Sequence, residues 1–436
     1  MSILGGREEI PRILERTKVD EIIITSPTMR PKELKDLMNR FREADVRFKI
    51  IPPMSDIINE SVSIKQLRDV SVEDLLGRKT VRLDEDLIRE HLEGRVVLIT
   101  GAGGTIGAEL ARQIAKMDPE ELILFERNEN NLFMTEWELA TRFPHVRLMP
   151  VIGDIMDREG LDRVMRQFRP AVVFHSAAYK HVPMMERHPA SAVQNNVIGT
   201  LNCALASVEA GVERFVFIST DKAVRPTNVM GMTKRVGELI LQSLSSKGTG
   251  TKFIAVRFGN VMGSAGSVIP LFQRQIAEGG PVTVTHPKAR RYFMTIREAA
   301  QLVMQAAAMG AGGEIFVLEM GEQILILDLA RNLIRLSGLE PERDIEVKFI
   351  GLRPGEKLAE ELYASKEGVE PTRHDKIFAL PPQQPSPAHD FDARLKELIQ
   401  LTDQGDIGAA LAVMTTLTRD EGAGEETPPR PPSVLH

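Results

Sequence analysis

A glycine-rich stretch, LITGAGGTIGAELARQI at residues 98–114, constrains the fold more than any other part of the chain. An apolar run leads into it and a helical pattern leads out of it, with Gly101, Gly104 and Gly107 spaced three residues apart. Such glycines allow a tight turn and close approach of a pyrophosphate, while the helix supplies free N–H groups and a positive dipole end. A turn that binds no ligand is the alternative. The predicted dinucleotide site comprises Gly101, Gly104, Thr105, Ile106 and Gly107.

Strands and helices alternate on both sides of this stretch. From Arg95 on, strands are expected at 95–100, 122–126, 146–154, 171–177, 214–220 and 252–260. Parallel strands joined by crossover helices form a doubly wound sheet. We therefore predict the α/β class: a doubly wound parallel Rossmann sheet over 86–390, with a small substrate-binding lobe from about 260. A helix over 391–416 and a Pro- and Glu-rich end, expected to be disordered, make up 391–436.

The first 85 residues predict a small α/β N-terminal domain that precedes the Rossmann sheet. No complete glycine fingerprint occurs in it, so we expect a structural or docking role rather than nucleotide binding. Because the chain begins almost directly in a strand, we also expect a natural upstream region that this chain lacks. The expected strands are 2–5, 21–26 and 47–52, and the expected helices are 7–18 and 31–44.

Composition narrows the function classes. The 436 residues are too many for one ordinary core, and 42% hydrophobic with 27% charged residues is typical of a soluble globular protein. A net charge of -6 argues against nucleic acid but allows a local basic pocket for an anionic substrate. The single cysteine, Cys203, indicates a reducing compartment and is expected to be buried. No stretch reaches the roughly 18 apolar residues of a membrane span, and no metal-ligand spacing occurs.

Residues after the second, third and fourth strands complete the predicted cofactor site. Glu126 follows Gly101 by 25 positions and would accept the ribose hydroxyls, which favours NAD. Arg127 could instead bind a 2′-phosphate, which leaves NADP open. Asp154 is placed to meet the adenine, and a turn-forming aspartate is the competing interpretation. Two further cofactor contacts are expected at Ile155 and Ala177.

The segment STDKAVRPTNVMGMTKR at 219–235 follows another apolar strand and raises a chemical question. Its Lys234 opens a helical pattern in the place where a short-chain dehydrogenase has a Tyr-x-x-x-Lys pair. The tyrosine position is Met230, and none of the three tyrosines has a lysine four residues on. An acid and an amine, Asp221 and Lys222, instead stand at the strand end. A structural ion pair is the alternative interpretation of these two residues.

Several long segments in order resemble the extended short-chain dehydrogenase/reductase superfamily, and most closely its CapD-like nucleotide-sugar 4,6-dehydratases. These include the two segments above together with AAYKHVPMMERHPASAVQNNVIGT, VRFGNVMGSAGSVIPLF, HPKARRYFMTI and LRPGEKLAEELY. The resemblance covers about 270 residues. It implies NAD-dependent conversion of UDP-N-acetylglucosamine to a 4-keto-6-deoxy sugar nucleotide for bacterial polysaccharide or glycan synthesis, with retention at C5 favoured.

The resemblance also implies roles for single residues. Asp221 would assist departure of the C6 hydroxyl, and Lys222 would take the C5 proton, for which its pKa must be lowered by burial or nearby cations. Lys234 would bind the nicotinamide ribose. Met230 cannot exchange a proton, so Ser219 and Thr220 are expected to relay the C4 hydroxyl proton toward Asp221 or water.

The substrate residues follow from the same motifs. Lys180 and His181 would face the sugar, Asn260 the diphosphate, and Arg291, Arg353 and Glu356 the diphosphate and uridine. A solvated surface charge is the alternative for each arginine. The N-terminal segment resembles the part that joins a membrane-spanning bundle to the catalytic domain, which implies a membrane-anchored full-length protein with this part in the cytoplasm. A homo-oligomer is expected from the superfamily.

Two other functions remain open at this point. A sugar epimerase acting at C4 or C5 could use the same fold and cofactor, and it would not release water. A cofactor-sensing regulatory protein would explain the missing tyrosine. The presence of Lys234 and of the Asp221–Lys222 pair argues against that regulatory function.

Overall fold

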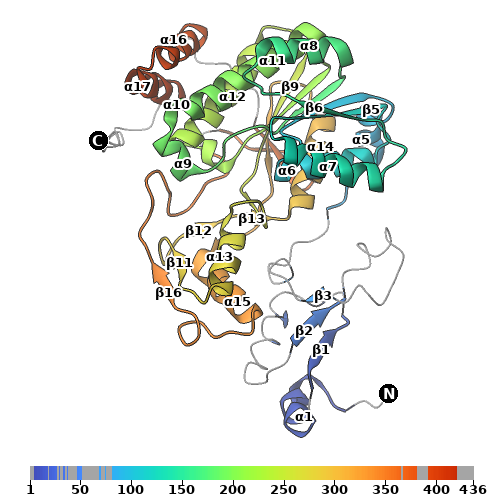
Figure 1. Cartoon of the computed structure of the whole chain (residues 1–436), viewed down its shortest axis with the longest axis vertical. Coiled ribbons are helices and arrows are strands. Elements are labelled where there is room, and N and C mark those ends of the chain that lie inside the picture. Colours follow the sequence, from blue (N-terminus) through green and yellow to red (C-terminus); the bar gives the residue numbers. More distant parts are fainter. Residues whose placement is uncertain are drawn as a thin grey trace. The chain divides into compact units, whose positions relative to one another are not determined.

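The computed structural model describes residues 81–364, 367–380 and 391–419. Before residue 81 it describes 4–17, 19–26, 47–51, 68–69 and a few single positions. The chain divides into two compact units (Figure 1). The larger unit consists of Val81–Ala265, Lys288–Ile324 and Gly351–His436, and the smaller of Met1–Thr80, Gly266–Pro287 and Leu325–Ile350.

The larger unit is built on a nine-stranded sheet of order β17-β18-β14-β9-β8-β7-β4-β5-β6. The seven strands from β14 to β6 are parallel. At one edge β18 pairs antiparallel with β14, and β17 pairs antiparallel with β18. The strand order reverses between β4 and β7, which confirms the doubly wound sheet. The strands are β4 (Val96–Thr100), β5 (Glu121–Glu126), β6 (Leu148–Ile152), β7 (Val172–His175), β8 (Arg214–Ile218), β9 (Lys252–Arg257), β14 (Ile315–Leu318), β17 (Glu370–Pro371) and β18 (Ile377–Leu380).

Helices cover both faces of this sheet because alternate strand residues point to opposite sides. Val97 and Ile99 of β4 belong to one buried core, and Leu98 between them belongs to the other. The first core packs under α5 (Glu85–Leu92), α6 (Thr105–Ala115), α7 (Glu129–Arg142) and α14 (Ile296–Met309). The second packs under α8 (Arg158–Phe168), α9 (Val182–Arg187), α10 (Pro189–Ala192), the π-helix η3 (Val193–Ile198), α11 (Gly199–Ala210) and α12 (Val229–Ser246).

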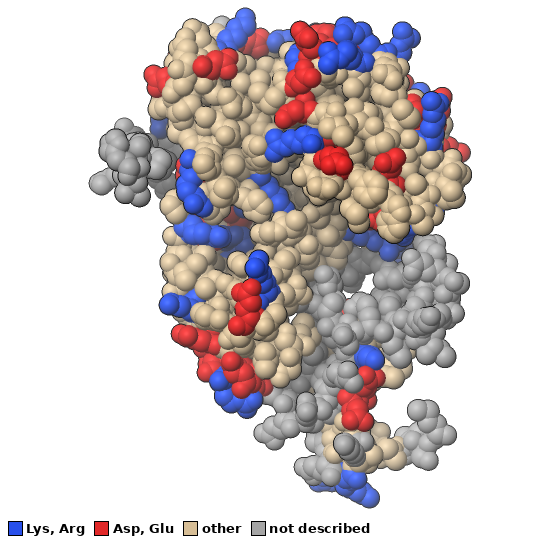
Figure 2. All heavy atoms as spheres, viewed as in Figure 1, with Lys and Arg blue, Asp and Glu red and all other residues tan. Residues whose placement is uncertain are grey.

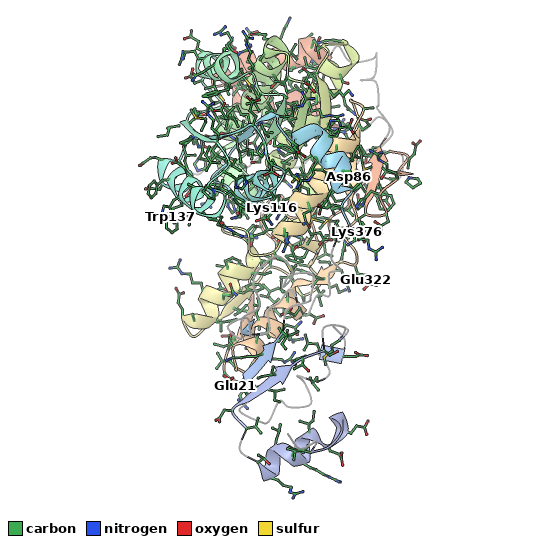
Figure 3. All side chains as sticks on the ribbon, turned by 90° about the vertical axis from the view of Figure 1, so that its right-hand side faces the viewer. Glu21, Asp86, Lys116, Trp137, Glu322 and Lys376 are labelled. Atoms are coloured by element: carbon green, nitrogen blue, oxygen red, sulfur yellow. The ribbon has the colours of Figure 1, made fainter. Side chains whose placement is uncertain are left out.

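Cys203 of α11 is fully buried, as expected, and burial raises the pKa of its thiol. On the opposite face, Trp137 of α7 points away from the sheet and is 59% exposed (Figure 3). The shorter elements of this unit are η4 (Asp221–Ala223), β10 (Asn260–Val261), β12 (Arg290–Arg291) and β13 (Phe293–Met294), with β10 parallel to β13.

The C-terminal part differs from the single helix expected over 391–416. Two helices, α16 (Phe391–Asp403) and α17 (Ile407–Thr418), are found instead. Gly405 adopts a left-handed conformation with φ +78°, which ends the first helix. Asp406 then caps the second by accepting a hydrogen bond from the backbone N–H of Ala409. The predicted disordered end, from residue 420 on, lies outside the described residues.

The smaller unit contains a three-stranded sheet in which β1 (Glu21–Ile24) is parallel to β2 (Arg47–Ile50) and β3 (Arg68–Asp69) is antiparallel to β2. The strands expected at 21–26 and 47–52 are thus confirmed in slightly shorter form. The helix expected at 7–18 is a short η1 (Arg7–Glu9) followed by α1 (Ile10–Arg16).

Two N-terminal expectations have a different outcome. Residues 4–6 are not a strand, because Gly6 caps η1 and its N–H donates to the Glu9 carboxylate. The expected helix at 31–44 lies almost entirely outside the described residues.

The remaining elements of the smaller unit are β11 (Val282–Val284), which is parallel to β16 (Val347–Phe349), and the helices α13 (Val268–Ala277) and α15 (Ile326–Leu336). In the sequence, the division between the two units falls within β15 (Ile324–Leu325). The domain boundaries at 85 and 390 stay predictions.

Candidate active site

The glycine-rich turn between β4 and α6 is a close-packed backbone cradle. Gly101 has φ +68°, and a Cβ there would lie 2.8 Å from the backbone of Ala177. A Cβ on Gly107 would lie 2.1 Å from the carbonyl oxygen of Gly101. No larger residue fits either position. The turn therefore leaves the backbone N–H groups at the N-terminus of α6 uncovered by side chains, and a pyrophosphate binds favourably to such groups. The residues present therefore fit a dinucleotide. Of the other predicted members, Gly104 is the N-cap of α6, and Ile106 packs against the core.

The acidic residue that ends β5 lies beside this turn. The Glu126 carboxylate accepts hydrogen bonds from the backbone N–H groups of Gly103 at 3.1 Å and Asn128 at 2.9 Å. Arg127 next to it points elsewhere: its guanidinium lies 4.7 Å from the ring centroid of Tyr179 and 3.8 Å from the Asp154 carboxylate. Arg127 thus already has an aromatic and an acidic partner.

Asp154 forms a turn, which was one of its two interpretations: its carboxylate accepts a hydrogen bond from the N–H of Met156 at 2.9 Å. Ile155 is buried, and a Cβ on Gly199 would collide with its side chain. Ala177 stands at the end of β7 against Gly101. These predicted cofactor residues therefore gather at the carboxyl end of the sheet, where doubly wound folds bind their ligands.

Asn196 organises the loop after β7. It is 1% exposed and lies in the π-helix η3. Its Oδ1 accepts the N–H of Tyr179 at 2.8 Å, and its Nδ2 donates to the Tyr179 carbonyl at 2.9 Å and to Thr233 at 3.0 Å. Asn196 thereby fixes the backbone just before Lys180 and His181.

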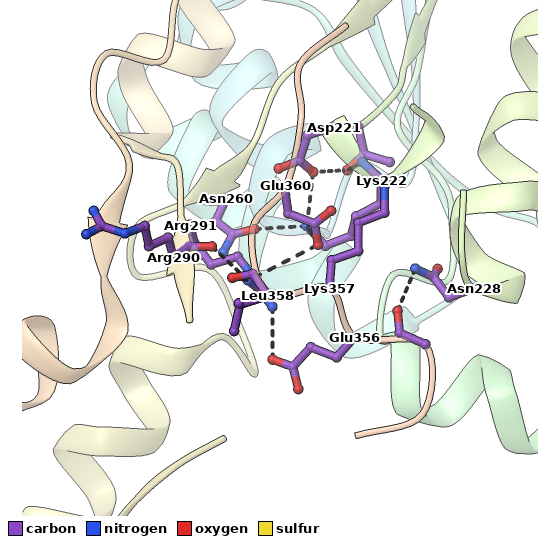
Figure 4. A network of polar contacts seen from close by, with 12 residues as sticks. Asp221, Lys222, Asn228, Asn260, Arg290, Arg291, Glu356, Lys357, Leu358 and Glu360 are labelled. Carbon is purple, nitrogen blue, oxygen red and sulfur yellow. Dashed lines mark hydrogen bonds and ion pairs between the residues drawn. The ribbon is translucent and has the colours of Figure 1, made fainter. Parts of the chain in front are cut away.

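The centre of the site is the residue group that we call the acid–base cluster: Thr220, Asp221, Lys222, Asn260 and Glu360. The Lys222 ammonium lies 3.0 Å from Asp221 Oδ1, 3.1 Å from Asn260 Oδ1 and 3.8 Å from Glu360 Oε1 (Figure 4). Asp221 is fully buried and Glu360 is 3% exposed. Asp221 Oδ2 and Glu360 Oε2 are both buried without a hydrogen-bond partner among the described residues.

The charge state of Lys222 differs from the expectation. Burial lowers its pKa, but the negative charges of Asp221 and Glu360 outweigh burial and raise the pKa above its usual value. The expected lowering is therefore wrong for this arrangement, and Lys222 is an ammonium paired with two carboxylates.

The two candidate relay hydroxyls point in different directions. Thr220 Oγ1 donates to Asp221 Oδ1 at 2.9 Å and belongs to the acid–base cluster. Ser219 Oγ donates to Glu238 Oε1 at 2.6 Å, so the structure does not bring Ser219 to that cluster. These two residues directly follow β8, and Thr220 has an extended backbone, so the neighbouring side chains face different partners.

Ser219 belongs instead to a second group of buried charges, the Arg257 network: Ser219, Arg235, Glu238, Arg257 and Glu367. Arg257 on β9 donates from Nε and Nη2 to the Glu238 carboxylate at 2.7 and 2.8 Å, and from Nη1 to Glu367 at 2.9 and 3.0 Å. Burial raises the pKa of Glu238, but the Arg257 guanidinium outweighs it and holds that pKa at about 2. The Arg257 network was missed from the sequence. It ties α12 to β9.

Helix α12 carries the two residues of the modified tyrosine–lysine motif. Asn228 caps it by accepting the N–H of Gly231 at 2.7 Å. Met230 is 4% exposed and packs in the second core. The Lys234 ammonium lies 3.8 Å from the ring centroid of Phe217, and burial lowers its pKa to about 7 against the opposing charge of Glu238.

The predicted substrate residues form a chain of charges beside the acid–base cluster. Arg291 Nη2 lies 3.0 Å from Glu356 Oε1, and Arg353 Nε lies 3.4 Å from Glu356 Oε2. Burial lowers the pKa of Lys180. Burial also lowers the pKa of His181, and the positive charges of Lys180 and Arg353 lower it further. Lys and Arg side chains gather at mid-height of the face shown in Figure 2.

Glu360 and Lys357 were not singled out from the sequence, although both stand in the LRPGEKLAEELY segment. This segment is irregular and is held against the loop between β8 and α12. Lys357 Nζ donates to the carbonyl of Val224 at 2.9 Å, and Asn228 Nδ2 donates to that of Gly355 at 3.1 Å. Contacts between residues more than 120 positions apart thus bring Glu360 to Lys222.

Neither a metal centre nor a membrane-spanning helix is found in the part of the chain that the structure describes. No three acidic, histidine or cysteine side chains gather there as metal ligands would. None of the described helices is long and apolar enough to cross a bilayer.

Comparison with known proteins shows the family. Residues 97–382 match the family model described as "Polysaccharide biosynthesis protein". The chain belongs to this polysaccharide biosynthesis family. It is 47% identical over 380 residues to the "Capsular polysaccharide biosynthesis protein CapD" of Staphylococcus aureus, an alignment that covers 87% of this chain and 63% of CapD. The chain thus spans less than two thirds of the length of this relative.

Solved structures support the same assignment. Pen from Bacillus thuringiensis is 36% identical, with a TM-score of 0.62 over 67% of this chain and 89% of Pen. A dTDP-glucose 4,6-dehydratase of Streptomyces venezuelae, solved with NAD and DAU bound, has a TM-score of 0.54 over 61% of this chain and 87% of its own. At 24% identity it shows the shared fold alone. This member of the polysaccharide biosynthesis family therefore shares the fold of that dehydratase.

Proposed function

We propose that the chain catalyses NAD-dependent 4,6-dehydration of UDP-N-acetylglucosamine to a UDP-4-keto-6-deoxy-N-acetylhexosamine. The observation that carries the proposal is the acid–base cluster. The Thr220 hydroxyl and the Lys222 ammonium, which flank Asp221 in the sequence, both donate hydrogen bonds to its carboxylate. Besides hydride transfer, dehydration needs an acid for the C6 hydroxyl and a base for the C5 proton, and a plain reductase needs neither of these two groups. The identity of the sugar and of the uridine rests on the resemblance to the CapD-like dehydratases.

NAD is the proposed cofactor because the glycine cradle accepts a pyrophosphate and Glu126 stands where ribose hydroxyls are bound. Arg127 is engaged by Tyr179 and Asp154, which argues against its binding a 2′-phosphate. A bound nicotinamide would supply the hydride acceptor for sugar C4 and the hydride donor for C6. Lys234 would hold the ribose next to the nicotinamide.

The proton of the C4 hydroxyl follows a route that needs no tyrosine. Thr220 accepts this proton while passing its own to Asp221, whose carboxylate already accepts the Thr220 hydroxyl at 2.9 Å. Asp221 then gives the proton to the C6 hydroxyl as the C6–O bond breaks. The departing water contains the C6 oxygen and the former C4 hydroxyl proton, and Asp221 ends as it began, as a carboxylate.

Lys222 handles the remaining proton. As a neutral amine it removes the proton from C5, which the C4 ketone has made acidic. The protonated amine exchanges its protons with solvent and gives one back to C5 after the hydride reaches C6. Return to the same face retains the configuration, as the resemblance favours. Asn260 accepts a hydrogen bond from Lys222 at 3.1 Å and so holds the amine in one direction.

The substrate's diphosphate is the partner that the neighbouring cations favour. The positive charges of Lys180 and Arg353 both act on His181, and arginine forms paired hydrogen bonds with phosphate. Arg291 and Glu356 would hold the uridine side. From the resemblance of the N-terminal segment to the part that joins a membrane-spanning bundle to the catalytic domain, we infer a membrane-anchored full-length protein, and from the superfamily we expect a homo-oligomer.

Proton NMR of UDP-N-acetylglucosamine with the chain and NAD in D2O tests the proposal. A new C6 methyl signal with deuterium at C5 is the expected result, and the C5 coupling reports retention or inversion. A changed sugar that keeps its C6 hydroxymethyl group would favour the epimerase. Demonstrated NAD binding without any change in this or other UDP-sugars would refute the dehydratase.

A further inference from the structure

Lys222 has one proton too many for its proposed role. It must begin the reaction as a neutral amine, yet its ammonium lies 3.0 Å from Asp221 and 3.8 Å from Glu360. One proton must therefore leave Lys222 before it can remove the proton from C5. Asp221 cannot keep this proton, because it has to be ionised to receive the proton of the C4 hydroxyl. Another acceptor is required within the acid–base cluster.

Glu360 is built for this purpose. Its Oε1 faces the Lys222 ammonium, while its Oε2 is buried without a hydrogen-bond partner among the described residues (Figure 4). A buried carboxylate with an unsatisfied oxygen is costly, whereas a neutral carboxyl group costs much less. Glu360 is held in place because Lys357, three residues earlier, donates to the carbonyl of Val224.

We propose that Glu360 accepts the surplus proton of Lys222 and holds it during turnover. The proposal rests on the dehydration proposed above. An N–H bond of the ammonium breaks and an O–H bond forms on Glu360 Oε1, which leaves a neutral amine and a neutral carboxyl group without changing the net charge. Nζ has to approach Oε1 by about 1 Å to reach hydrogen-bonding distance.

Binding of the sugar supplies the driving force. The Lys222 side chain keeps 16% of its surface exposed in this structure. Covering that surface removes water from the ion pair, and a low-dielectric site favours the neutral pair over two charges. Glu360 thus acts through Lys222 and need not touch the reacting atoms.

The charges around Glu360 pull in both directions. Burial raises its pKa above the usual range, and the charge of Asp221 adds to the rise. The positive charges of Lys222, Arg291 and Lys357 reduce the rise without cancelling it. Once Lys222 is neutral, the first of these opposing charges disappears, so the carboxyl group becomes easier still to protonate.

Glu360→Gln tests the transfer by its pH dependence. In the unmodified chain the transfer is internal, so kcat should be level from about pH 7 to 9. Glutamine keeps the shape but accepts no proton, so Lys222 must then lose its proton to water. We expect kcat to fall about 100-fold at pH 7 and to rise about tenfold per pH unit. Glu361→Gln is the matched control: this carboxylate is 42% exposed and pairs with Arg225, and its removal should leave a level profile.

Two kinetic outcomes would overturn the proposal. An E360Q enzyme with unchanged or higher kcat would show that Glu360 only keeps Lys222 charged. A loss of the same factor at every pH would assign Glu360 a purely structural role, because packing defects do not follow hydroxide concentration.

A measurement without turnover separates this proposal from the proposed function. Lys222→Met replaces the ammonium by a neutral side chain of similar length, as in the state after proton transfer. Infrared spectra should then show a protonated carboxyl band at about pH 7 that K222M/E360Q lacks and K222M/E361Q keeps. Absence of that band in K222M would mean that Glu360 stays ionised beside a neutral residue 222, and the proposal would fail whatever the substrate proves to be.

Discussion

Two groups of buried charges flank the end of β8, and they differ in how fully they are hydrogen bonded. In the Arg257 network, all three guanidinium nitrogens of Arg257 donate to the carboxylates of Glu238 and Glu367. In the acid–base cluster, Asp221 and Glu360 each keep one buried oxygen without a partner among the described residues.

This difference separates structural from chemical roles. A complete buried network holds two elements together and resists titration, since each charge is compensated. An incomplete one retains free lone pairs and near-balanced protonation states, which is the condition for moving protons. The two groups share one strand end, because Ser219 points into the first and Thr220 and Asp221 into the second.

Removal of the base tests the chemical side most strongly. Lys222→Ala should lower kcat by about 10³- to 10⁴-fold, because no other amine in the acid–base cluster can take the C5 proton. NAD affinity, measured by calorimetry, should not change. Lys247→Ala, which removes an exposed lysine paired with Asp392, is the control for loss of charge alone. Normal turnover by K222A would remove Lys222 from the base role.

Removal of the guanidinium tests the structural side. Arg257→Met leaves Glu238 and Glu367 buried without their partner, and urea unfolding should show a loss of about 3–5 kcal/mol. Arg274→Met removes an arginine that is 78% exposed and pairs with Glu278, so it should leave the stability almost unchanged. Equal losses in the two variants would mean that the Arg257 network does not hold α12 to β9.

Sequence patterns predicted the parts of this molecule that depend on near neighbours. The turn at Gly101–Gly107 follows from the steric needs of consecutive residues, and the doubly wound sheet follows from strand and helix periodicities. Asp221 and Lys222 were found because they are adjacent. Even so, the direction of the Lys222 pKa was mispredicted. The adjacent Asp221 raises this pKa most, and Glu360, a residue 138 positions away along the chain, raises it further.

Distant partners explain what the sequence did not indicate. Glu360 reaches Lys222 only through the packing of an irregular segment, and no local period marks it. Arg257 looks like the polar end of a strand until Glu238, on a different element, is brought against it. Ser219 and Thr220 looked equivalent as relay hydroxyls, and only the direction of each side chain after the end of β8 distinguishes them.

Lys234 should make the stability of the chain depend on pH, since it is buried over Phe217 and its pKa is lowered to about 7. Below pH 7 the lysine is charged in both folded and unfolded chains, so burial costs its full amount. Above pH 7 Lys234 loses its proton in the folded chain but keeps it in the unfolded chain. The cost of burying the charge therefore declines as the pH rises, and it disappears near the pKa of lysine in the unfolded chain. Lys234→Met should therefore be more stable by about 1–4 kcal/mol at pH 6, a gap that narrows toward pH 10. A gap that is constant with pH in urea unfolding would contradict this.

Met230→Tyr should have the smallest effect on the reaction, because the proposed route moves the C4 hydroxyl proton through Thr220 and Asp221. The larger ring overpacks a site that is 4% exposed, so stability should fall by about 1–3 kcal/mol. Met232→Tyr, on the same helix and 8% exposed, adds equal bulk and isolates that packing cost. We expect kcat of M230Y to stay within about tenfold of the original, equivalent to about 1.4 kcal/mol. A rise beyond that range, absent in M232Y, would mean that a tyrosine is the better proton acceptor and that the acid–base cluster alone does not carry the C4 proton.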